Sequence, residues 1–121
     1  MPNKERKFSR NMRGISMNDE IGKINITKPL WRHLGCPQYI KFTYKNHDWI
    51  KLTKGSPDCP SSGHVVQQGT GLAINDVELV RCIYKEYKII RYDKTVMSPF
   101  YTALYREESG EKVVYVKLNN F

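Results

Sequence analysis

Apolar and polar residues alternate in two stretches near the beginning of the chain, and this period of two predicts strands. Ile24 and Ile26 form the first alternating pair, after a turn at residues 19–22. In the second stretch, Ile40, Phe42 and Tyr44 share one face, while the intervening residues are lysine and threonine. Residues 49–52 then return as the second strand of a hairpin.

A short helix is expected between these two stretches. The Thr27 hydroxyl can cap its first turn, where Pro29 is tolerated because a first-turn N–H needs no partner. Leu30 and Leu34 recur at helical spacing with Trp31, and Gly35 can end the helix in a left-handed conformation. Such a β-α-β-β unit, residues 15–54, is too small to bury its own apolar face.

The second half of the chain has a similar order of patterns. Residues 55–71 begin with glycine, proline and serine and are interpreted as a linker loop. From residue 72 the chain predicts a strand, a helix that begins with a capping box at Asn75 and Glu78, and a hairpin across residues 107–111. Residues 72–121 are therefore interpreted as a second β-α-β-β-like unit packed on the first.

The two predicted helices have their apolar residues at corresponding positions. Leu30, Trp31 and Leu34 of the first correspond to Leu79, Val80 and Ile83 of the second. We therefore expect a mainly β fold, a small barrel with two short helices. Either one chain forms an internal pseudo-dimer of the two units, or two chains form a homodimer. Strand aromatics such as Phe42, Tyr44, Tyr101 and Tyr105 are expected to face the core rather than to form a stacking platform.

The chain is basic, with 20 Lys and Arg against 12 Asp and Glu and a formal net charge of +8. This charge favours nucleic acid or an acidic protein surface as a partner. Residues 1–14 carry five basic residues and few large apolar ones, so we expect a flexible basic arm.

Several classes of protein are disfavoured by the sequence. The sequence has no run of about 18 apolar residues, the length that a transmembrane helix needs. No apolar segment follows the basic N-terminus, which disfavours a secretory signal. We therefore expect a cytoplasmic protein without a membrane partner. His33, Cys36, Cys59 and His64 lack the tight spacing of a zinc site, so neither a metal nor another cofactor is expected. No cysteine has an evident oriented base, so the chain is not expected to be an enzyme.

Residues 15–52 resemble a known family. The run Asp19-Glu20-Ile21-Gly22-Lys23-Ile24-x-Ile26, followed by Leu30-x-Arg32-x-Leu34-Gly35 and a hairpin, is similar to the N-terminal domain of the AbrB/SpoVT and MazE regulators. In that family two such units pair into one swapped-hairpin barrel that binds DNA. The resemblance implies a transcription regulator or antitoxin-like repressor.

The resemblance also implies which residues contact double-stranded DNA. Lys23 matches the family's basic residue after the glycine, and Arg32 matches a basic residue on the family's short helix. Lys28, Arg13 and Arg10 would contact DNA phosphates. Ser16 and Trp31 stand where the family often has arginines. These two positions and the acidic second unit favour an alternative function: an inhibitor or adaptor, encoded by a phage or mobile element, that binds a nucleic-acid-processing complex.

Overall fold

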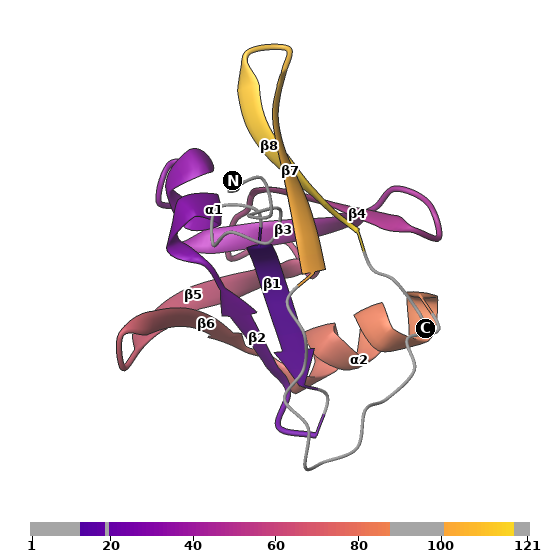
Figure 1. The fold of residues 1–121 in the computed structure, drawn as a ribbon. Coiled ribbons are helices and arrows are strands. Elements are labelled where there is room, and N and C mark those ends of the chain that lie inside the picture. Colours follow the sequence, from indigo (N-terminus) through magenta and orange to yellow (C-terminus); the bar gives the residue numbers. More distant parts are fainter. Residues whose placement is uncertain (1–12, 19, 88–100, 118–121) are drawn as a thin grey trace, which may run out of the picture.

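The computed structural model describes residues 13–18, 20–87 and 101–117, which form eight strands and two helices (Figure 1). In chain order these elements are β1 (Arg13–Asn18), β2 (Lys23–Ile26), α1 (Lys28–His33), β3 (Tyr39–Tyr44), β4 (Trp49–Lys54), β5 (Ser62–Gln68), β6 (Gly71–Asn75), α2 (Val77–Tyr87), β7 (Tyr101–Glu108) and β8 (Glu111–Lys117).

The strands close into one barrel in which all neighbouring strands are antiparallel. Around the barrel they follow the order β1, β2, β6, β5, β3, β4, β8, β7, and β7 pairs with β1. The mainly β barrel with two short helices that the sequence predicts is therefore confirmed.

Hairpins from the two halves of the chain alternate around this barrel. The first half supplies the hairpins β1–β2 and β3–β4, and the second half supplies β5–β6 and β7–β8. Each hairpin pairs on both edges with a hairpin of the other half, through the pairs β2–β6, β3–β5, β4–β8 and β1–β7. Because an isolated two-stranded hairpin is marginally stable in water, neither half can complete its sheet alone.

The arrangement of strands has the order expected of a two-fold repeat. Exchanging β1 with β5, β2 with β6, β3 with β7 and β4 with β8 reproduces the same order of neighbours around the barrel. The helices follow the same relation, since Thr27 precedes α1 and Asp76 precedes α2. Leu30 and Leu34 are buried in the first half, as are the corresponding Leu79 and Ile83 in the second. The predicted order strand, helix, hairpin is extended by one strand at the start of each half.

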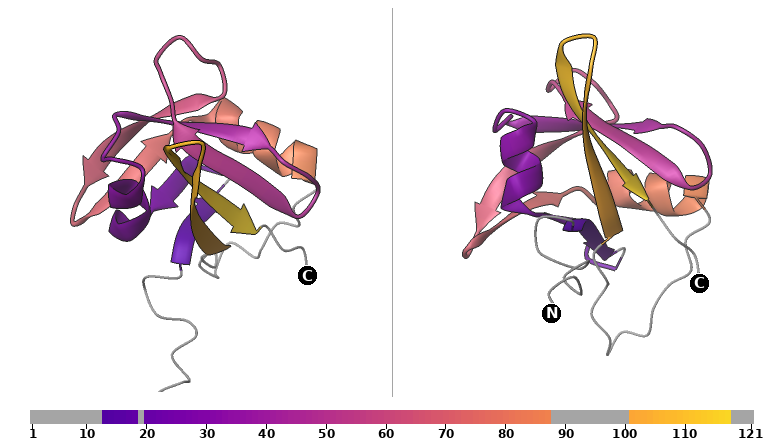
Figure 2. Two further views of the ribbon diagram at one scale, coloured as in Figure 1. Left: turned by 90° about the horizontal axis from the view of Figure 1, so that it is seen from above. Right: turned by 45° about the horizontal axis from the view of Figure 1, so that its top comes forward.

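The core lies inside the barrel and under the two helices. Its buried apolar side chains come from both halves and include Ile15, Met17, Ile24, Ile26, Leu30, Ile40, Phe42, Ile50, Leu52, Ile74, Val80, Val114 and Val116. The helix α1 contacts β7 and β8, whereas α2 contacts β2. The Tyr87 hydroxyl of α2 also donates a hydrogen bond to the Trp49 carbonyl of β4, 2.8 Å away. Each helix therefore covers strands of the other half, and the two lie on opposite sides of the barrel (Figure 2).

The interpretation of residues 55–71 as a linker loop is wrong for much of this segment. Residues 62–68 form β5, which pairs with both β3 and β6. The cluster of turn-forming residues ends at Gly63, so it hides the start of the strand. Val65 and Val66 are both only partly exposed, which explains why β5 has a weak pattern of alternation.

The arm predicted for residues 1–14 is also too long. Arg13 and Gly14 belong to β1, and the Gly14 carbonyl accepts a hydrogen bond from the Thr27 N–H at 3.2 Å. The rest of that arm lies outside the described residues, as does the region of the second half between α2 and β7. The second unit itself begins with β5 rather than at residue 72.

Two local predictions need correction. The residue that caps α2 is Asp76, whose Oδ1 accepts a hydrogen bond from the Leu79 N–H at 3.0 Å, whereas Asn75 is the last residue of β6. Tyr44, expected in the core, is 52% exposed because it lies at the end of β3, where its ring packs against that of Tyr87. Thr27 does precede α1, but its hydroxyl donates to the Gly14 carbonyl instead of capping the helix.

Two features of the structure require glycine at position 22. Its φ is +65°, and a Cβ at this position would clash with the Cα of Val77, at the start of α2. We expect Gly22→Ala to lower the free energy of unfolding by about 2–5 kcal/mol, because left-handed strain and overpacking add together.

Gly69 provides the matched control, since it has a similar φ of +61° but nothing within 4 Å of an added Cβ. Gly69→Ala should lose only about 1–2 kcal/mol, the cost of the left-handed conformation. Urea unfolding of the two variants measures the difference, and equal losses would contradict the close approach of Gly22 to α2.

Candidate functional site

The helix α1 presents two of the predicted DNA-contacting residues on one face. Lys28 and Arg32 are four positions apart on this helix, so their side chains lie one above the other, and both are exposed. The helix is fixed in orientation because Leu30 is buried and the Trp31 indole N–H donates to the Pro37 carbonyl at 2.9 Å. The structure therefore brings Lys28 and Arg32 together on the surface.

The other predicted DNA-contacting residues lie elsewhere. Lys23 is partly buried and begins β2, where it pairs with Asn18 and Asn75, whereas α1 follows the far end of β2. Four strand residues span about 10–13 Å, so Lys23 is not part of the pair on α1. Arg13 begins β1 and pairs with Thr102, but its side chain is not described. Arg10 lies outside the described residues.

The two helices differ in charge at corresponding positions. Arg32 on α1 corresponds to Arg81 on α2, and both are exposed. Lys28, however, corresponds to Val77, and the next residue of α2 is Glu78. The two-fold repeat of the backbone is therefore not matched by a two-fold repeat of basic side chains. The exposed cations that lie four positions apart on α2 are instead Arg81 and Lys85, so Lys28 has no basic counterpart at the corresponding position.

A second surface combines aromatic and basic side chains on the outside of β4, β8 and β7. The inward residues Ile50, Leu52, Val114 and Val116 are buried, so the residues between them face outward. On this outer face Trp49 pairs with Lys117, and Lys51 pairs with Tyr115.

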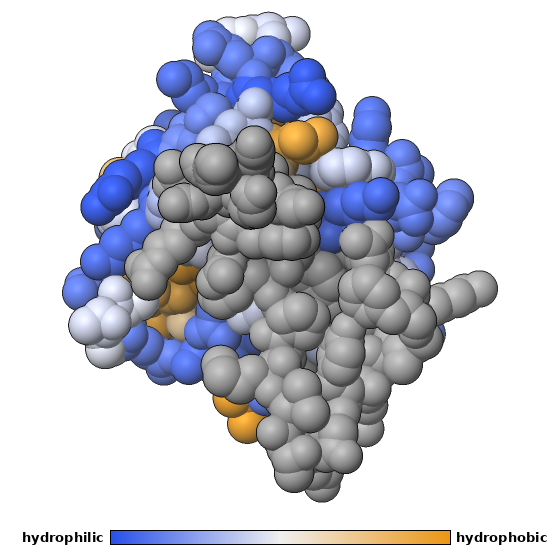
Figure 3. Space-filling model, viewed as in Figure 1, coloured by the Kyte–Doolittle hydropathy of each residue, from blue (hydrophilic) through white to orange (hydrophobic). Residues whose placement is uncertain are grey.

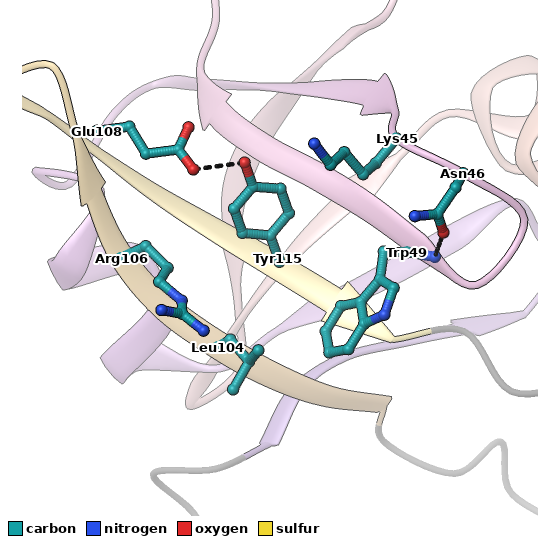
Figure 4. Close-up of a pocket in the computed structure, with 7 residues that line it drawn as sticks. All are labelled: Lys45, Asn46, Trp49, Leu104, Arg106, Glu108 and Tyr115. Carbon is teal, nitrogen blue, oxygen red and sulfur yellow. Dashed lines mark hydrogen bonds between the residues drawn. The ribbon is translucent and has the colours of Figure 1, made fainter.

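This outer face is hollowed by an open depression of about 320 Å³ (Figure 4). Its lining residues come from three strands and the β3–β4 turn: Lys45, Asn46, Trp49, Leu104, Arg106, Glu108 and Tyr115. The rest of the described surface seen in Figure 3 is mainly hydrophilic, with small separate apolar areas. We name this depression the β4–β8–β7 depression.

Glu108 is held at one end of the depression by two neighbours. The Tyr115 hydroxyl donates to its Oε2 at 2.6 Å, and the Lys51 Nζ lies 3.2 Å from its Oε1. The Tyr115 hydrogen bond, followed by the Lys51 contact, lowers the pKa of the Glu108 carboxyl. In return, the hydrogen bonds to Glu108 raise the pKa of Lys51 and that of Tyr115. Each neighbour thus stabilises the carboxylate.

The histidines and cysteines considered as zinc ligands are not brought together. His33 Nε2 lies 3.0 Å from the Arg106 carbonyl and 3.1 Å from that of Val113, so this nitrogen carries the hydrogen and donates to them. The His33 ring also stacks on Tyr105, and His64 stacks on Tyr39. Among the described residues no group of three metal-ligating side chains forms. The contacts of His33 instead attach α1 to the β7–β8 hairpin.

The pKa of the Cys59 thiol is lowered from its ordinary value. A hydrogen bond with the Ser61 hydroxyl, at 3.3 Å, is the largest cause of its lowered pKa.

Reasoning from the sequence missed the β4–β8–β7 depression. Trp49 and Tyr115 alternate with buried residues in their strands, and this alternation could have placed each on an outer face. Their proximity, however, depends on the pairing of β4 with β8, two strands far apart in the sequence. No pattern within either strand specifies that register.

The Glu108 contacts predict how stability depends on pH. Because the folded state lowers this pKa from its ordinary value of 4.5, the stabilisation is fully present above that value. It is lost as the pH falls through the lower pKa of the folded protein. The melting temperature of the wild type should therefore exceed that of Glu108→Gln at neutral pH, and this difference should shrink on acidification below pH 4.5.

Glu107→Gln serves as the control, because Glu107 is adjacent on β7 and points to the other side of the strand. Melting curves recorded by circular dichroism across the acid range measure both variants. If the melting temperature of the wild type exceeded that of Glu108→Gln by the same amount in strong acid as at neutral pH, the stabilisation could not be assigned to the ionised Glu108 carboxylate.

No helix in the described part of the chain is long and apolar enough to cross a membrane. Comparison of the chain with protein-family models, with curated proteins and with solved structures found no match. The roles of Lys23, Lys28 and Arg32 in binding DNA, which the resemblance to the AbrB/SpoVT and MazE regulators implies, therefore stay predictions.

Proposed function

We propose that this protein binds double-stranded DNA as a regulator or antitoxin-like repressor, through the basic face of its first half. Lys28 and Arg32 on α1 contact the DNA, and Lys23 contributes from the start of β2. The observation that carries the proposal is the exposed pair on α1, a helix whose opposite side is fixed to the barrel by Leu30 and Trp31. A fixed helix holds its cations in place, so less side-chain freedom is lost on binding.

The barrel supports the same proposal. The resemblance to the AbrB/SpoVT and MazE regulators implies a swapped-hairpin barrel, and in this chain hairpins of the two halves alternate around one barrel. The formal net charge of +8 favours a polyanion as partner. Because Lys28 has no basic counterpart on α2, this protein would meet DNA with one side rather than symmetrically.

A second candidate function follows from that asymmetry. The positions of α2 that correspond to Lys28 and Pro29 are Val77 and Glu78, so the second half has no counterpart of Lys28 and carries an acidic residue beside that position. An inhibitor or adaptor that occupies an acidic groove of a nucleic-acid-processing protein needs only one basic face. Such a protein would not bind free duplex DNA even at low salt, and this separates the two candidates.

We expect the protein to bind a mixed-sequence duplex with an affinity that falls steeply as salt increases. Replacing Lys28 and Arg32 with glutamine removes two phosphate contacts, so the slope of log K against log salt should decrease in magnitude by about 2. Fluorescence anisotropy of a labelled duplex across a salt series measures this slope.

Arg81→Gln is the matched control, since Arg81 occupies the corresponding position on α2 and is also exposed. Its salt slope should equal that of the wild type. Duplex binding that is unchanged in the Lys28 and Arg32 double variant would contradict the assignment of α1. No duplex binding by the wild type at low salt would favour the inhibitor instead.

A further inference from the structure

The outer face of β4, β8 and β7 differs from the basic face of α1, because it contains aromatic rings as well as cations. Trp49 and Tyr115 are both partly exposed there. Cross-strand pairing places Lys117 beside Trp49 and places Lys51 and Leu104 on either side of Tyr115. Basic and aromatic side chains therefore alternate across β4 and β8, and Leu104 of β7 lies beside them.

The side chains around the β4–β8–β7 depression point toward the same open space. Figure 4 shows Trp49 and Tyr115 side by side, with Lys45 above the indole and Arg106 on the opposite side, beyond Tyr115. The Lys45 ammonium lies 5.8 Å from the centre of the Tyr115 ring. The floor is thus aromatic, and cations stand at its margins.

The single carboxylate that lines this depression does not cancel its positive charge. Glu108 is engaged by the Tyr115 hydroxyl and by Lys51, so its negative charge is compensated within the protein. Lys45, Arg106 and Lys117 add three further positive charges around the aromatic rings. An uncharged or anionic ligand with a flat ring fits this surface, whereas an acidic side chain alone would leave the rings without a partner.

We propose that the β4–β8–β7 depression binds single-stranded nucleic acid. A base stacks on the Trp49 indole, and the flanking phosphates lie against Lys45, Arg106 and Lys117. Aromatic side chains between cations are the combination that holds single strands without sequence preference, since every base has a face that can stack. This site is on different elements from Lys28 and Arg32, and it does not depend on duplex binding by α1.

Tryptophan fluorescence can report binding at this site directly. The sequence contains two tryptophans, so Trp31→Phe leaves Trp49 as the only one. An oligothymidylate of about 12 nucleotides, within the usual range of site sizes, should quench the Trp49 emission in a saturable way. Absence of saturable quenching at low salt would overturn the proposal.

Variants at the floor of the site separate stacking from simple charge attraction. In anisotropy measurements with the same labelled oligonucleotide, Trp49→Leu should weaken binding by about 5- to 150-fold, whereas Trp49→Phe keeps a stacking ring and should retain most of the affinity. The Trp49 carbonyl that accepts from Tyr87 is a backbone group, so it remains in both variants. Equal binding by Trp49→Leu and Trp49→Phe, with unchanged melting temperatures, would overturn the proposal.

Charge variants test the margins of the site. Replacing Lys45, Arg106 and Lys117 with glutamine should reduce the magnitude of the single-strand salt slope by about 2, or 0.7 for each contact. Lys85→Gln on α2 is the control, since this exposed lysine lies on another element. A slope that changes equally in the control would assign the effect to net charge and overturn the site.

The variants of the two proposed sites, each measured with both single-stranded and duplex DNA, distinguish this proposal from duplex binding by α1. The Lys28 and Arg32 double variant should retain single-strand affinity, and Trp49→Leu should retain duplex affinity if the duplex proposal holds. If the double variant lost as much single-strand affinity as Trp49→Leu, the proposal that the two sites are separate would be overturned.

Thymidine monophosphate should quench the Trp49 emission far more weakly than the oligonucleotide. Equal affinity for the mononucleotide would overturn a strand-binding site in favour of a nucleotide pocket.

Discussion

The pairing of strand edges between the two halves of the chain is the constraint on which this structure depends. Each half supplies two hairpins, and a hairpin alone leaves backbone N–H and C=O groups along both of its edges. In the barrel every one of these edges meets a hairpin of the other half. Closing the barrel therefore pairs the backbone groups of the hairpin edges and buries the apolar side chains at the same time. Neither half can do this alone. We expect the two halves to fold as one cooperative unit.

The same constraint determines where functional side chains can stand. Residues that point into the barrel are committed to the core, so polar chemistry is confined to the outer strand faces and to the exposed side of each helix. On α1 the buried Leu30 leaves Lys28 and Arg32 facing solvent. On β4 and β8 the buried Ile50 and Val116 leave Trp49 and Tyr115 on the outside. Both proposed binding surfaces are consequences of this alternation.

The two halves of the barrel share their order of strands but need not have the same surface residues at corresponding positions. The backbone relation is kept by buried positions, such as Leu34 and Ile83, because these fill equivalent spaces under the two helices. Surface positions are free of that requirement, and Lys28 and Val77 accordingly differ in charge. A single chain that contains both halves can vary each surface independently, whereas a homodimer changes both surfaces with every substitution.

Much of the fold could be predicted from local pattern. The strand at Ile24 and Ile26 is confirmed, as are the short helix at Leu30 and the burial of Leu34 directly after it, since this spacing reflects burial within single elements. By contrast, β5 was not predicted, because its stability comes from pairing with β3 and β6 rather than from its own alternation. The β4–β8–β7 depression could not be predicted for the same reason, as it is created by register between distant strands.

The most direct test of this account is an isotope-filtered nuclear Overhauser experiment on a mixture of labelled and unlabelled protein. It distinguishes contacts within one chain from contacts between chains. We expect methyl contacts between Ile24 and Ile74, and between Ile50 and Val116, to arise within a single chain of 14.2 kDa. Absence of these contacts, or their appearance only between labelled and unlabelled chains, would contradict a barrel built by one chain from its own two halves.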